Sequence, residues 1–351
     1  MKNLILALSG IGDALMFTPA LRLLRKARPN AQIDVLVMFR GVKDLCESNP
    51  DIDKVIYFDF MKEGFINSLR FILSLRGKYN TTISVYPSNR KEYNIINYLL
   101  GAEKRVGVEY LRRNKTNLGW LNNITIKEND SLHNVQENIK LVEKLLKREF
   151  KEEPNLQIKL KESDNNFAKE FLQEKFVSEK DLVIGFHPGC ATLKNHSKRR
   201  WELEKFAALA KKLIENHSAR ILIFGGPEEN ELKQNIFNQI NSDKALVVNA
   251  PDLMKSVAVM KRCNLFVSND SSLMHFASAL GLKVVSIFGP TNQNYIHPWK
   301  TEHKIVSLNL DCSPCFFYSP KPLSCSRTDV KFKCIKELDI ETVYTSVKEF
   351  I

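Results

Sequence analysis

The chain has 351 residues, and at roughly 150 residues per domain this length predicts about two domains. Hydrophobic residues make up 44% and charged residues 26%, which excludes a disordered, collagen-like or fibrous chain. The formal net charge is +12, and most of it falls in residues 1–160, which hold 26 basic against 18 acidic side chains. Such an excess predicts an anionic partner, either nucleic acid, an acidic membrane surface or a phosphorylated substrate.

The apolar runs of the chain are short. Residues 4–8 and 284–288 are among the longest, far below the roughly 18 residues that a membrane-spanning helix needs. The N-terminus has one lysine and a brief apolar run before Ser9, Gly10 and the charged Asp13, which is too interrupted for a secretory signal. We therefore expect a cytoplasmic protein without a membrane span.

Short apolar runs alternate with amphipathic stretches along the first half, which is typical of an α/β fold whose parallel sheet is covered by helices. Strands are expected at 4–8, 33–37, 55–58 and 82–86, and helices at 14–28, 65–75, 92–100 and around the apolar stripe of 135–146. Residues 151–165 are polar and contain Pro154, although NLQIKL within them alternates like a strand. We place the link between two domains, 1–160 and 161–351, in this segment.

The second half repeats the same pattern. Its strands are expected at 183–187, 221–224, 246–248, 265–267 and 284–288, and its helices near 202–217, 228–240, 253–262 and 272–280. Two α/β domains of similar size with one link predict a ligand cleft between them.

Ligands of open parallel sheets bind outside the carboxyl ends of the strands, so the residues that follow each strand are informative. The first such loop is Ser9-Gly10-Ile11-Gly12-Asp13, and position 15 is a leucine where a dinucleotide fingerprint would need a third glycine. Asp13 has two interpretations: an acidic residue favoured at a helix N-terminus, or a general base that takes a proton from an attacking hydroxyl.

Two segments of the second half carry groups suited to an anion. The loop 192–201 holds Lys198 and Arg199 between a strand and a helix, either as a solvated charge run or as phosphate ligands. Asp270, Ser271 and Ser272 begin a helix directly after a strand, which points free backbone N–H groups at the same edge.

Two further residues of this half have open interpretations. His275 lies on the same helical face, one turn beyond the serines; it is either a ligand of the same anion or a core histidine. Glu229 follows Gly225-Gly226 and either accepts hydrogen bonds from ribose hydroxyls or favours the helix dipole.

Four stretches in the two halves carry a family resemblance: SGIGDALMFTPALRLLRKARPNAQIDVL, IGFHPGCATLKNHSKRRWELEKFAALAKKLIE, ILIFGGPEE and FVSNDSSLMHFASALGLKVVSIFGPTN. Together they resemble glycosyltransferase family 9, the heptosyltransferases of lipopolysaccharide core assembly. The resemblance implies a GT-B fold, with two Rossmann-like domains whose parallel sheets face each other across a cleft. It also implies an acceptor-binding domain at 1–160 and a nucleotide-sugar domain at 161–351.

The resemblance further implies an inverting transferase that moves a heptose from ADP-heptose to a lipopolysaccharide inner-core acceptor. Asp13 matches the family's acid after the first strand, which activates the acceptor hydroxyl. The remaining matches concern the donor: Arg199 with Lys198 for the diphosphate, Asp270, Ser271 and His275 at the helix N-terminus, Glu229 near the ribose, and Gly189 and Cys190 as donor-contacting positions. Ser272 stands where many members have glycine, so another nucleotide-sugar or acceptor remains an alternative, as does a non-catalytic nucleotide or anion binder.

Residues of the first half are candidates for the acceptor, an acidic lipid-linked saccharide at the inner face of the cytoplasmic membrane. They are Ser9, Gly10, Arg90, Arg112 and Arg113, and the arginines are equally explained as solubilising charge. We expect a peripheral association with that membrane surface and no nucleic-acid partner.

No metal is expected to be required for catalysis. Asp51-Ile52-Asp53 is the only D-x-D triplet, and its polar context predicts a surface turn rather than a metal site. The segment 312–334 has four cysteines in the order C-x2-C-x9-C-x8-C, at Cys312, Cys315, Cys325 and Cys334. They could hold a structural zinc ion, pack as reduced thiols or form a redox-dependent bridge.

Overall fold

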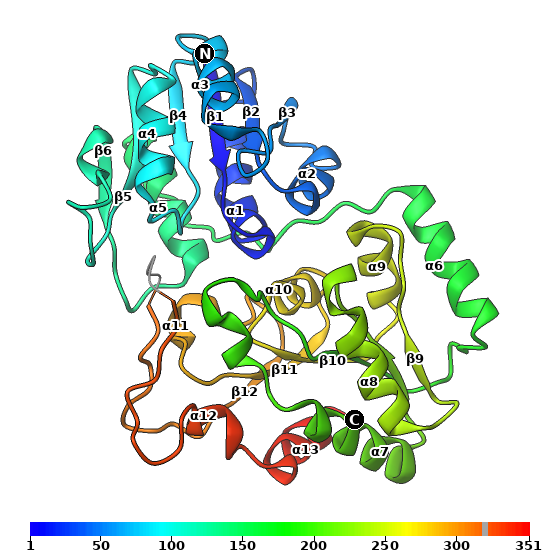
Figure 1. Cartoon of the computed structure of the whole chain (residues 1–351). Coiled ribbons are helices and arrows are strands. Elements are labelled where there is room, and N and C mark those ends of the chain that lie inside the picture. Colours follow the sequence, from blue (N-terminus) through cyan, green and yellow to red (C-terminus); the bar gives the residue numbers. More distant parts are fainter. Residues whose placement is uncertain (318–321) are drawn as a thin grey trace. The chain divides into compact units, whose positions relative to one another are not determined.

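Parallel strands alternate with helices along both halves of the chain, as the apolar pattern predicts (Figure 1). The computed structural model describes residues 1–317 and 322–351. These form two units: unit 1 holds residues 1–159, and unit 2 holds residues 160–317 and 322–351. The predicted roles of the two halves, acceptor and donor binding, are not tested by this division.

Unit 1 is built on a six-stranded parallel sheet in the order β3-β2-β1-β4-β5-β6. Its strands are β1 (Lys2–Ala7), β2 (Gln32–Val37), β3 (Lys54–Tyr57), β4 (Thr81–Ser84), β5 (Lys104–Glu109) and β6 (Ile124–Lys127). Its helices are α1 (Ile11–Ala27), α2 (Arg40–Glu47), α3 (Gly64–Leu75), α4 (Lys91–Leu99), the short η1 (Gly119–Leu121) and α5 (Asn134–Leu146).

The central strand β1 is apolar on both sides because helices cover both faces of its sheet. Leu4 and Leu6 belong to a core cluster with side chains of α3 and α4. Ile5 points to the opposite face, where it lines a small space together with Phe17 and Leu21 of α1. The continuous apolar run of β1 therefore indicates a strand that is buried on both faces of the sheet.

Unit 2 has a second six-stranded parallel sheet, in the order β12-β11-β10-β7-β8-β9. Its strands are β7 (Val183–His187), β8 (Arg220–Ile223), β9 (Ala245–Val247), β10 (Leu265–Asn269), β11 (Lys283–Ile287) and β12 (His303–Val306). Its helices are α6 (Glu162–Glu174), η2 (Leu193–Arg199), α7 (Leu203–His217), η3 (Pro227–Glu229), α8 (Asn230–Ile240), α9 (Leu253–Met260), α10 (Ser272–Ala279), α11 (Gln293–Ile296), α12 (Lys333–Lys336) and α13 (Ile340–Lys348).

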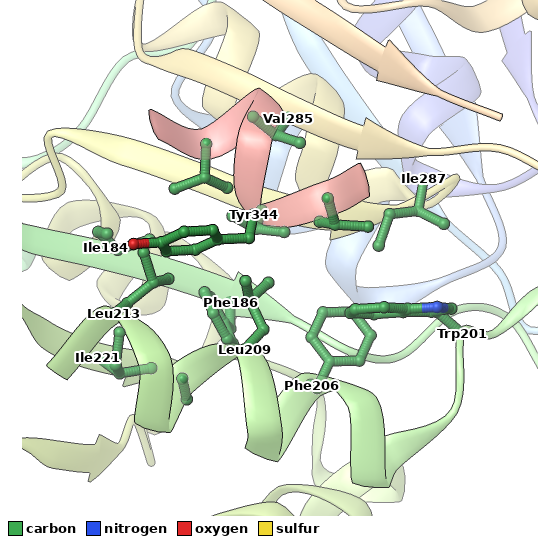
Figure 2. Close-up of a cluster of buried hydrophobic side chains, with 14 of the residues drawn as sticks. Ile184, Phe186, Trp201, Phe206, Leu209, Leu213, Ile221, Val285, Ile287 and Tyr344 are labelled. Carbon is green, nitrogen blue, oxygen red and sulfur yellow. The ribbon is translucent and has the colours of Figure 1, made fainter. Parts of the chain in front are cut away.

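An aromatic group between the sheet, α7 and α13 forms part of the core of unit 2 (Figure 2). The ring of Phe206 meets those of Phe186 and Trp201 edge-on, at centroid distances of 5.7 and 5.1 Å. The indole N–H of Trp201 donates a hydrogen bond to the carbonyl of Leu338 at 2.9 Å, so the only polar atom of that buried side chain has a partner. Trp201 thereby anchors the end of the loop that follows β7.

Each sheet has a point at which the chain reverses its direction of strand addition, between β1 and β4 in unit 1 and between β7 and β10 in unit 2. Ligands of open parallel sheets bind at these points, because the loops from the two central strands leave in opposite directions and open a crevice. The Ser9–Asp13 loop follows β1, and the loops at 188–200 and 270–272 follow β7 and β10. The predicted site residues therefore lie at the switch points of their own sheets.

The sequence expectations miss several elements. Residues 151–160, which include NLQIKL, are irregular as expected of a link, and α6 begins at Glu162 within the predicted link segment. The missed elements are α2, β5, β6, β12, α13 and the short helices α11 and α12. Among the described residues, no helix is long and apolar enough to cross a membrane.

A buried carboxyl group joins α5 to the preceding loop in unit 1. Glu137 is fully buried, and its Oε1 accepts a hydrogen bond from the backbone N–H of Asn129 at 2.6 Å. Burial, with a smaller contribution from the charges of Glu128 and Asp130, raises the pKa of Glu137 to about 7, although the Asn129 hydrogen bond and the charge of Lys140 act to lower it. The folded chain therefore holds this proton at pH values where an unfolded chain would release it.

Because the pKa of Glu137 is higher in the folded state, its contribution to the unfolding free energy falls as pH rises from about 4.5 to above 7. The Glu137→Gln variant keeps an acceptor for Asn129 and cannot ionise, so its unfolding free energy should fall less over this range than that of the wild type. Urea unfolding at a series of pH values measures the difference. Glu143→Gln on the same helix is the control, since Glu143 accepts a comparable hydrogen bond from Phe150 N–H at 2.8 Å. Equal pH slopes for Glu137→Gln and the wild type would contradict the prediction.

Candidate functional site

Asp13 lies in the first turn of α1, directly after the loop that follows β1. Its Oδ2 accepts a hydrogen bond from the backbone N–H of Gly10, the N-cap residue, at 3.0 Å, as the acid at the third helical position does in a capping box. Both interpretations of Asp13 remain compatible with this position, because the carboxylate caps the helix and is also only partly buried. Its catalytic role stays a prediction.

Two tyrosines from neighbouring elements face the charge of Asp13. Tyr93 lies in the first turn of α4, and Tyr110 follows β5. Burial raises the pKa of both phenols; for each, the negative charge of Asp13 raises it further, whereas Arg90 opposes the rise at Tyr93. Sequence reasoning missed both tyrosines, because only the fold brings α4 and the end of β5 to the end of β1.

The candidate acceptor residues separate into two groups. Ser9 and Gly10 lie beside Asp13, and Arg90 is the N-cap of α4 with its guanidinium over the Tyr93 ring at 5.8 Å. Arg112 instead forms a two-point ion pair with Asp130, at 2.7 and 3.1 Å.

Arg113, next to Arg112, is exposed and has a left-handed backbone (φ 65°). Of the three arginines, Arg90 is the one linked by its contacts to the surroundings of Asp13.

The triplet Asp51-Ile52-Asp53 lies in the turn that its sequence predicts, with Asp53 exposed, but Asp51 is not on the surface. Asp51 is buried and accepts a hydrogen bond from Arg22 at 3.2 Å. Asp53 accepts from Arg25 at 2.7 Å and from the backbone N–H of Ile33 at 2.6 Å. The two carboxylates tie α1 to the entrance of β3, and this structural role explains their spacing.

In unit 2, His187 connects the ends of three strands. At the end of β7, its Nδ1 lies 2.7 Å from Ser271 Oγ and its Nε2 lies 3.0 Å from Glu229 Oε2. Glu229 also accepts from Gly226 N–H at 3.1 Å. The loops after β7, β8 and β10 are therefore linked through one buried imidazole.

Two arginines at the end of the β7 loop are held by carboxylates. Arg199 is buried and donates to Asp270 Oδ2, and Arg200 donates to Glu229 Oε1 at 3.0 Å. Burial alone would raise the pKa of Glu229, but hydrogen bonds from His187 and Gly226 and the charge of Arg200 outweigh it and hold that pKa below its ordinary value. Lys198, the second predicted cation, is exposed. Glu229 therefore already binds protein donors with both oxygens, in addition to any role toward a ribose.

The N-terminus of α10 is directed at the same strand ends. Ser271 is its N-cap, but its side chain does not cap the helix, because its Oγ lies 2.7 Å from His187 Nδ1 and 2.9 Å from Ser268 Oγ. Asp270 does not cap the helix either, since it pairs with Arg199. Among the described residues, no side chain therefore caps the start of this helix at Ser272.

His275 lies one turn into α10 and is buried. Burial lowers the pKa of His275 to about 4. Its ring is therefore neutral near pH 7 and adds no positive charge to the N-terminus of the helix. Within residues 1–317 and 322–351, its Nδ1 has no hydrogen-bond partner.

The glycine after His187-Pro188 is required by packing. A Cβ on Gly189 would lie 1.8 Å from Glu229 Oε1, so only glycine lets the loop run past that carboxylate. Cys190, next in the chain, is buried and donates from Sγ to the carbonyl of His196 at 3.2 Å. Burial raises the pKa of Cys190, which favours the neutral thiol.

Lys233 on α8 is a further residue that sequence reasoning missed. It is buried and donates from Nζ to the carbonyls of Gly225 and Val248, both at 3.2 Å, and to Asn249 Oδ1 at 3.1 Å. Burial lowers its pKa. Its hydrogen bonds fix the glycine loop that carries Glu229. Nothing in the local sequence distinguishes Lys233 from the exposed lysines of the chain.

The four cysteines of segment 312–334 lie in described residues, although 318–321 within that segment fall outside them. Cys312 Sγ accepts from Arg327 at 3.6 Å, and Cys325 Sγ accepts from the N–H of Phe332 at 3.3 Å. Across the described residues, no three potential ligands are arranged to hold a metal ion. A structural zinc ion stays a prediction, which metal analysis of the purified protein tests.

Comparisons with known proteins agree on one family. The model of glycosyltransferase family 9 (heptosyltransferase) matches residues 69–323. A lipooligosaccharide heptosyltransferase 2 of Campylobacter jejuni is 33% identical over 177 residues, 48% of this chain and 51% of that protein, so this chain spans about half the length of that relative. A lipopolysaccharide heptosyltransferase 2 of Salmonella typhimurium is 26% identical over 88% of each chain.

A solved structure confirms the predicted fold. The ADP-heptose heptosyltransferase II of Escherichia coli superposes with a TM-score of 0.76 at 20% identity, covering 100% of this chain and 98% of the other. The predicted GT-B class, with two Rossmann-like parallel-sheet domains, is confirmed by that likeness and by the two sheets described above.

The contact between Gly189 and Glu229 predicts a coupled pair of substitutions. Gly189→Ala should destabilise unit 2 by about 1–3 kcal/mol, because the added methyl group overlaps the carboxylate. Glu229→Ala removes the overlapping group, so the double variant should lose less stability than the sum of the two single variants. Chemical denaturation of all four proteins measures the coupling. Strictly additive losses would show that the carboxylate does not restrict position 189.

Proposed function

Because the chain belongs to glycosyltransferase family 9, we propose that it transfers a heptose from ADP-heptose to an inner-core lipopolysaccharide acceptor with inversion of the anomeric centre. The relatives described above support the sugar and the acceptor through the activities in their names. One observation supports donor binding by unit 2: the uncapped N-terminus of α10 lies beside Arg199 at the switch point of the second sheet.

Departure of the nucleoside diphosphate is the step that this site favours. As the bond between the anomeric carbon and the phosphate oxygen breaks, negative charge grows on the leaving oxygen. The first-turn N–H groups at Ser272 and the guanidinium of Arg199 supply fixed positive charge for it. Asp270 orients that guanidinium, because its carboxylate accepts a hydrogen bond from one of the guanidinium nitrogens.

The attacking side is assigned to Asp13. Its carboxylate takes the proton of the acceptor hydroxyl while that oxygen attacks the anomeric carbon, so one displacement forms the new glycosidic bond and releases ADP. The hydrogen bond from Gly10 N–H to Oδ2 holds the carboxylate in position at the start of α1. Ser9 and Arg90 are proposed to bind the acidic saccharide, and the enzyme works at the inner face of the cytoplasmic membrane.

Two alternatives share the fold and are separated by binding measurements. Ser272 narrows the space at the helix start, so another nucleotide-sugar remains a competing donor. Calorimetric titration with ADP, UDP and GDP distinguishes them; preference for UDP would contradict ADP-heptose. Donor binding without release of ADP from any saccharide acceptor would favour a non-catalytic nucleotide binder.

The Asp13→Asn variant tests the general base. Asparagine can still accept the Gly10 hydrogen bond, so the helix start should fold, but without a base kcat should fall about 10²–10⁴-fold. Affinity for ADP should stay within about twofold of the wild type, because the donor site lies in unit 2. Release of ADP with a truncated core acceptor gives kcat, and calorimetry gives the affinity.

Asp339→Asn is the matched control, since Asp339 is likewise an acidic residue at a helix start, where it accepts from Thr342 N–H at 2.7 Å. It should leave kcat unchanged. An Asp13→Asn enzyme with wild-type turnover would remove Asp13 from the mechanism.

The Arg199→Ala variant tests the diphosphate site. Loss of the guanidinium removes a charge-assisted contact and leaves Asp270 facing the phosphates, so affinity for ADP should fall at least about tenfold. Arg220→Ala is the control, because Arg220 is also partly buried and paired, with Asp181 at 2.8 Å, but lies at the start of β8. Equal ADP affinities for the two variants would contradict the assignment.

A further inference from the structure

Helix α3 of unit 1 carries exposed apolar side chains beside its buried apolar face. Ile72 and Leu75 on its inner face are buried in the core cluster with α4 and β1. Phe65 and Ile66 in its first turn are 80% and 65% exposed, and Leu73 is 47% exposed. A surface helix is expected to carry polar residues where it faces water, so the exposed apolar side chains of α3 are unusual.

These exposed side chains form one surface. At 100° per residue, Phe65, Ile66 and Leu73 fall within about 100° of one another around the helix. Met61, just before the helix, is 71% exposed. We call these four residues the outer face of α3. Single exposed apolar side chains are ordinary, whereas a group of this kind marks a contact with a partner.

The outer face is held by a rigid support. Phe71 of α3 stacks on Phe58 at the end of β3, with ring centroids 4.0 Å apart, and Phe58 meets Phe60 edge-on at 4.8 Å. The helix is therefore fixed to the sheet by aromatic packing, close to the carboxyl end of β3. α3 is labelled in Figure 1, where it belongs to the same unit as α4.

Basic residues surround the outer face. Lys62, Arg70, Arg76 and Lys78 are exposed, and Glu63 is the exposed acid among them. An apolar surface bordered by lysine and arginine is complementary to a bilayer with anionic headgroups, where apolar side chains enter the interface and cations meet the phosphates. A second copy of this chain fits less well, because a twofold contact would place like charges opposite each other.

We infer that the outer face of α3 docks unit 1 on the surface of an anionic lipid bilayer. The choice of a bilayer over another anionic partner rests on the proposed function, whose acceptor is lipid-linked. The outer face enters the membrane–water interface without spanning the membrane, and the four basic side chains bind the phosphates of the lipid headgroups. This surface consists of other residues than the arginines that the sequence suggested for the acceptor.

Sedimentation of the full chain with vesicles tests the inference. The wild type should bind vesicles of phosphatidylcholine containing about 30% phosphatidylglycerol, and bind pure phosphatidylcholine more weakly. Phe65→Ser combined with Ile66→Ser should lower the partition coefficient at least about tenfold, and Lys62→Glu with Arg70→Glu should remove the preference for the anionic lipid. Phe176→Ser in unit 2 is the matched control, because Phe176 is 82% exposed, and it should bind like the wild type.

Three results would overturn the docking surface: no binding by the wild type, equal binding by the Phe65/Ile66 variant, or a concentration-dependent dimer that this variant abolishes. Thermal unfolding of each variant checks that the fold is intact. Turnover is measured separately on a saccharide acceptor that lacks its lipid, and the α3 variants should retain it. An inactive wild type that still binds vesicles would count against the proposed function and for the docking surface.

Discussion

Two buried ion pairs fix the geometry on which the donor side of unit 2 depends. Arg199 with Asp270 and Arg200 with Glu229 join the loop after β7 to the loops after β10 and β8. A buried charge that loses its partner is strongly destabilising, so these pairs constrain three loops at once. Because Asp270 is engaged by Arg199 and Ser271 by His187, neither side chain covers the start of α10. The positive end of α10 therefore lies near the guanidinium groups of Arg199 and Arg200, without a side-chain cap.

The central strands of both sheets could be predicted from the sequence because they are buried on two sides and contain little else than apolar residues. The peripheral elements could not. β5 reads KRVGVE and β12 reads HKIV, so the charges of these strands interrupt the apolar pattern. NLQIKL, which lies in the predicted link, alternates like a strand, but residues 151–160 join no sheet. Alternation is a property of the segment alone, whereas a strand also needs a neighbour with free backbone groups.

The location of the site in the fold could be predicted from the sequence, but the contacts between its side chains could not. Parallel strands end at a common edge, so the residues that follow β7 and β10 could be assigned to one crevice from their order in the chain. Their partners could not, since His187 meets Glu229 and Ser271 at separations of 42 and 84 residues. Asp51 shows the same limit, because only the path of α1 brings Arg22 to it and turns an apparent surface triplet into a buried support.

The outer face of α3 changes how the positive charge of the first half is interpreted. Scattered lysines and arginines attract any polyanion. Four of them near exposed apolar side chains favour a surface that is both anionic and apolar, such as a bilayer with anionic headgroups. An enzyme bound to that surface and a lipid-linked acceptor are both confined to the plane of the membrane, which raises the effective concentration of the acceptor. The two molecules then meet more often, without any increase in the affinity for the saccharide. In the proposed docking, the water-exposed apolar area on α3 places unit 1 where such acceptors are found.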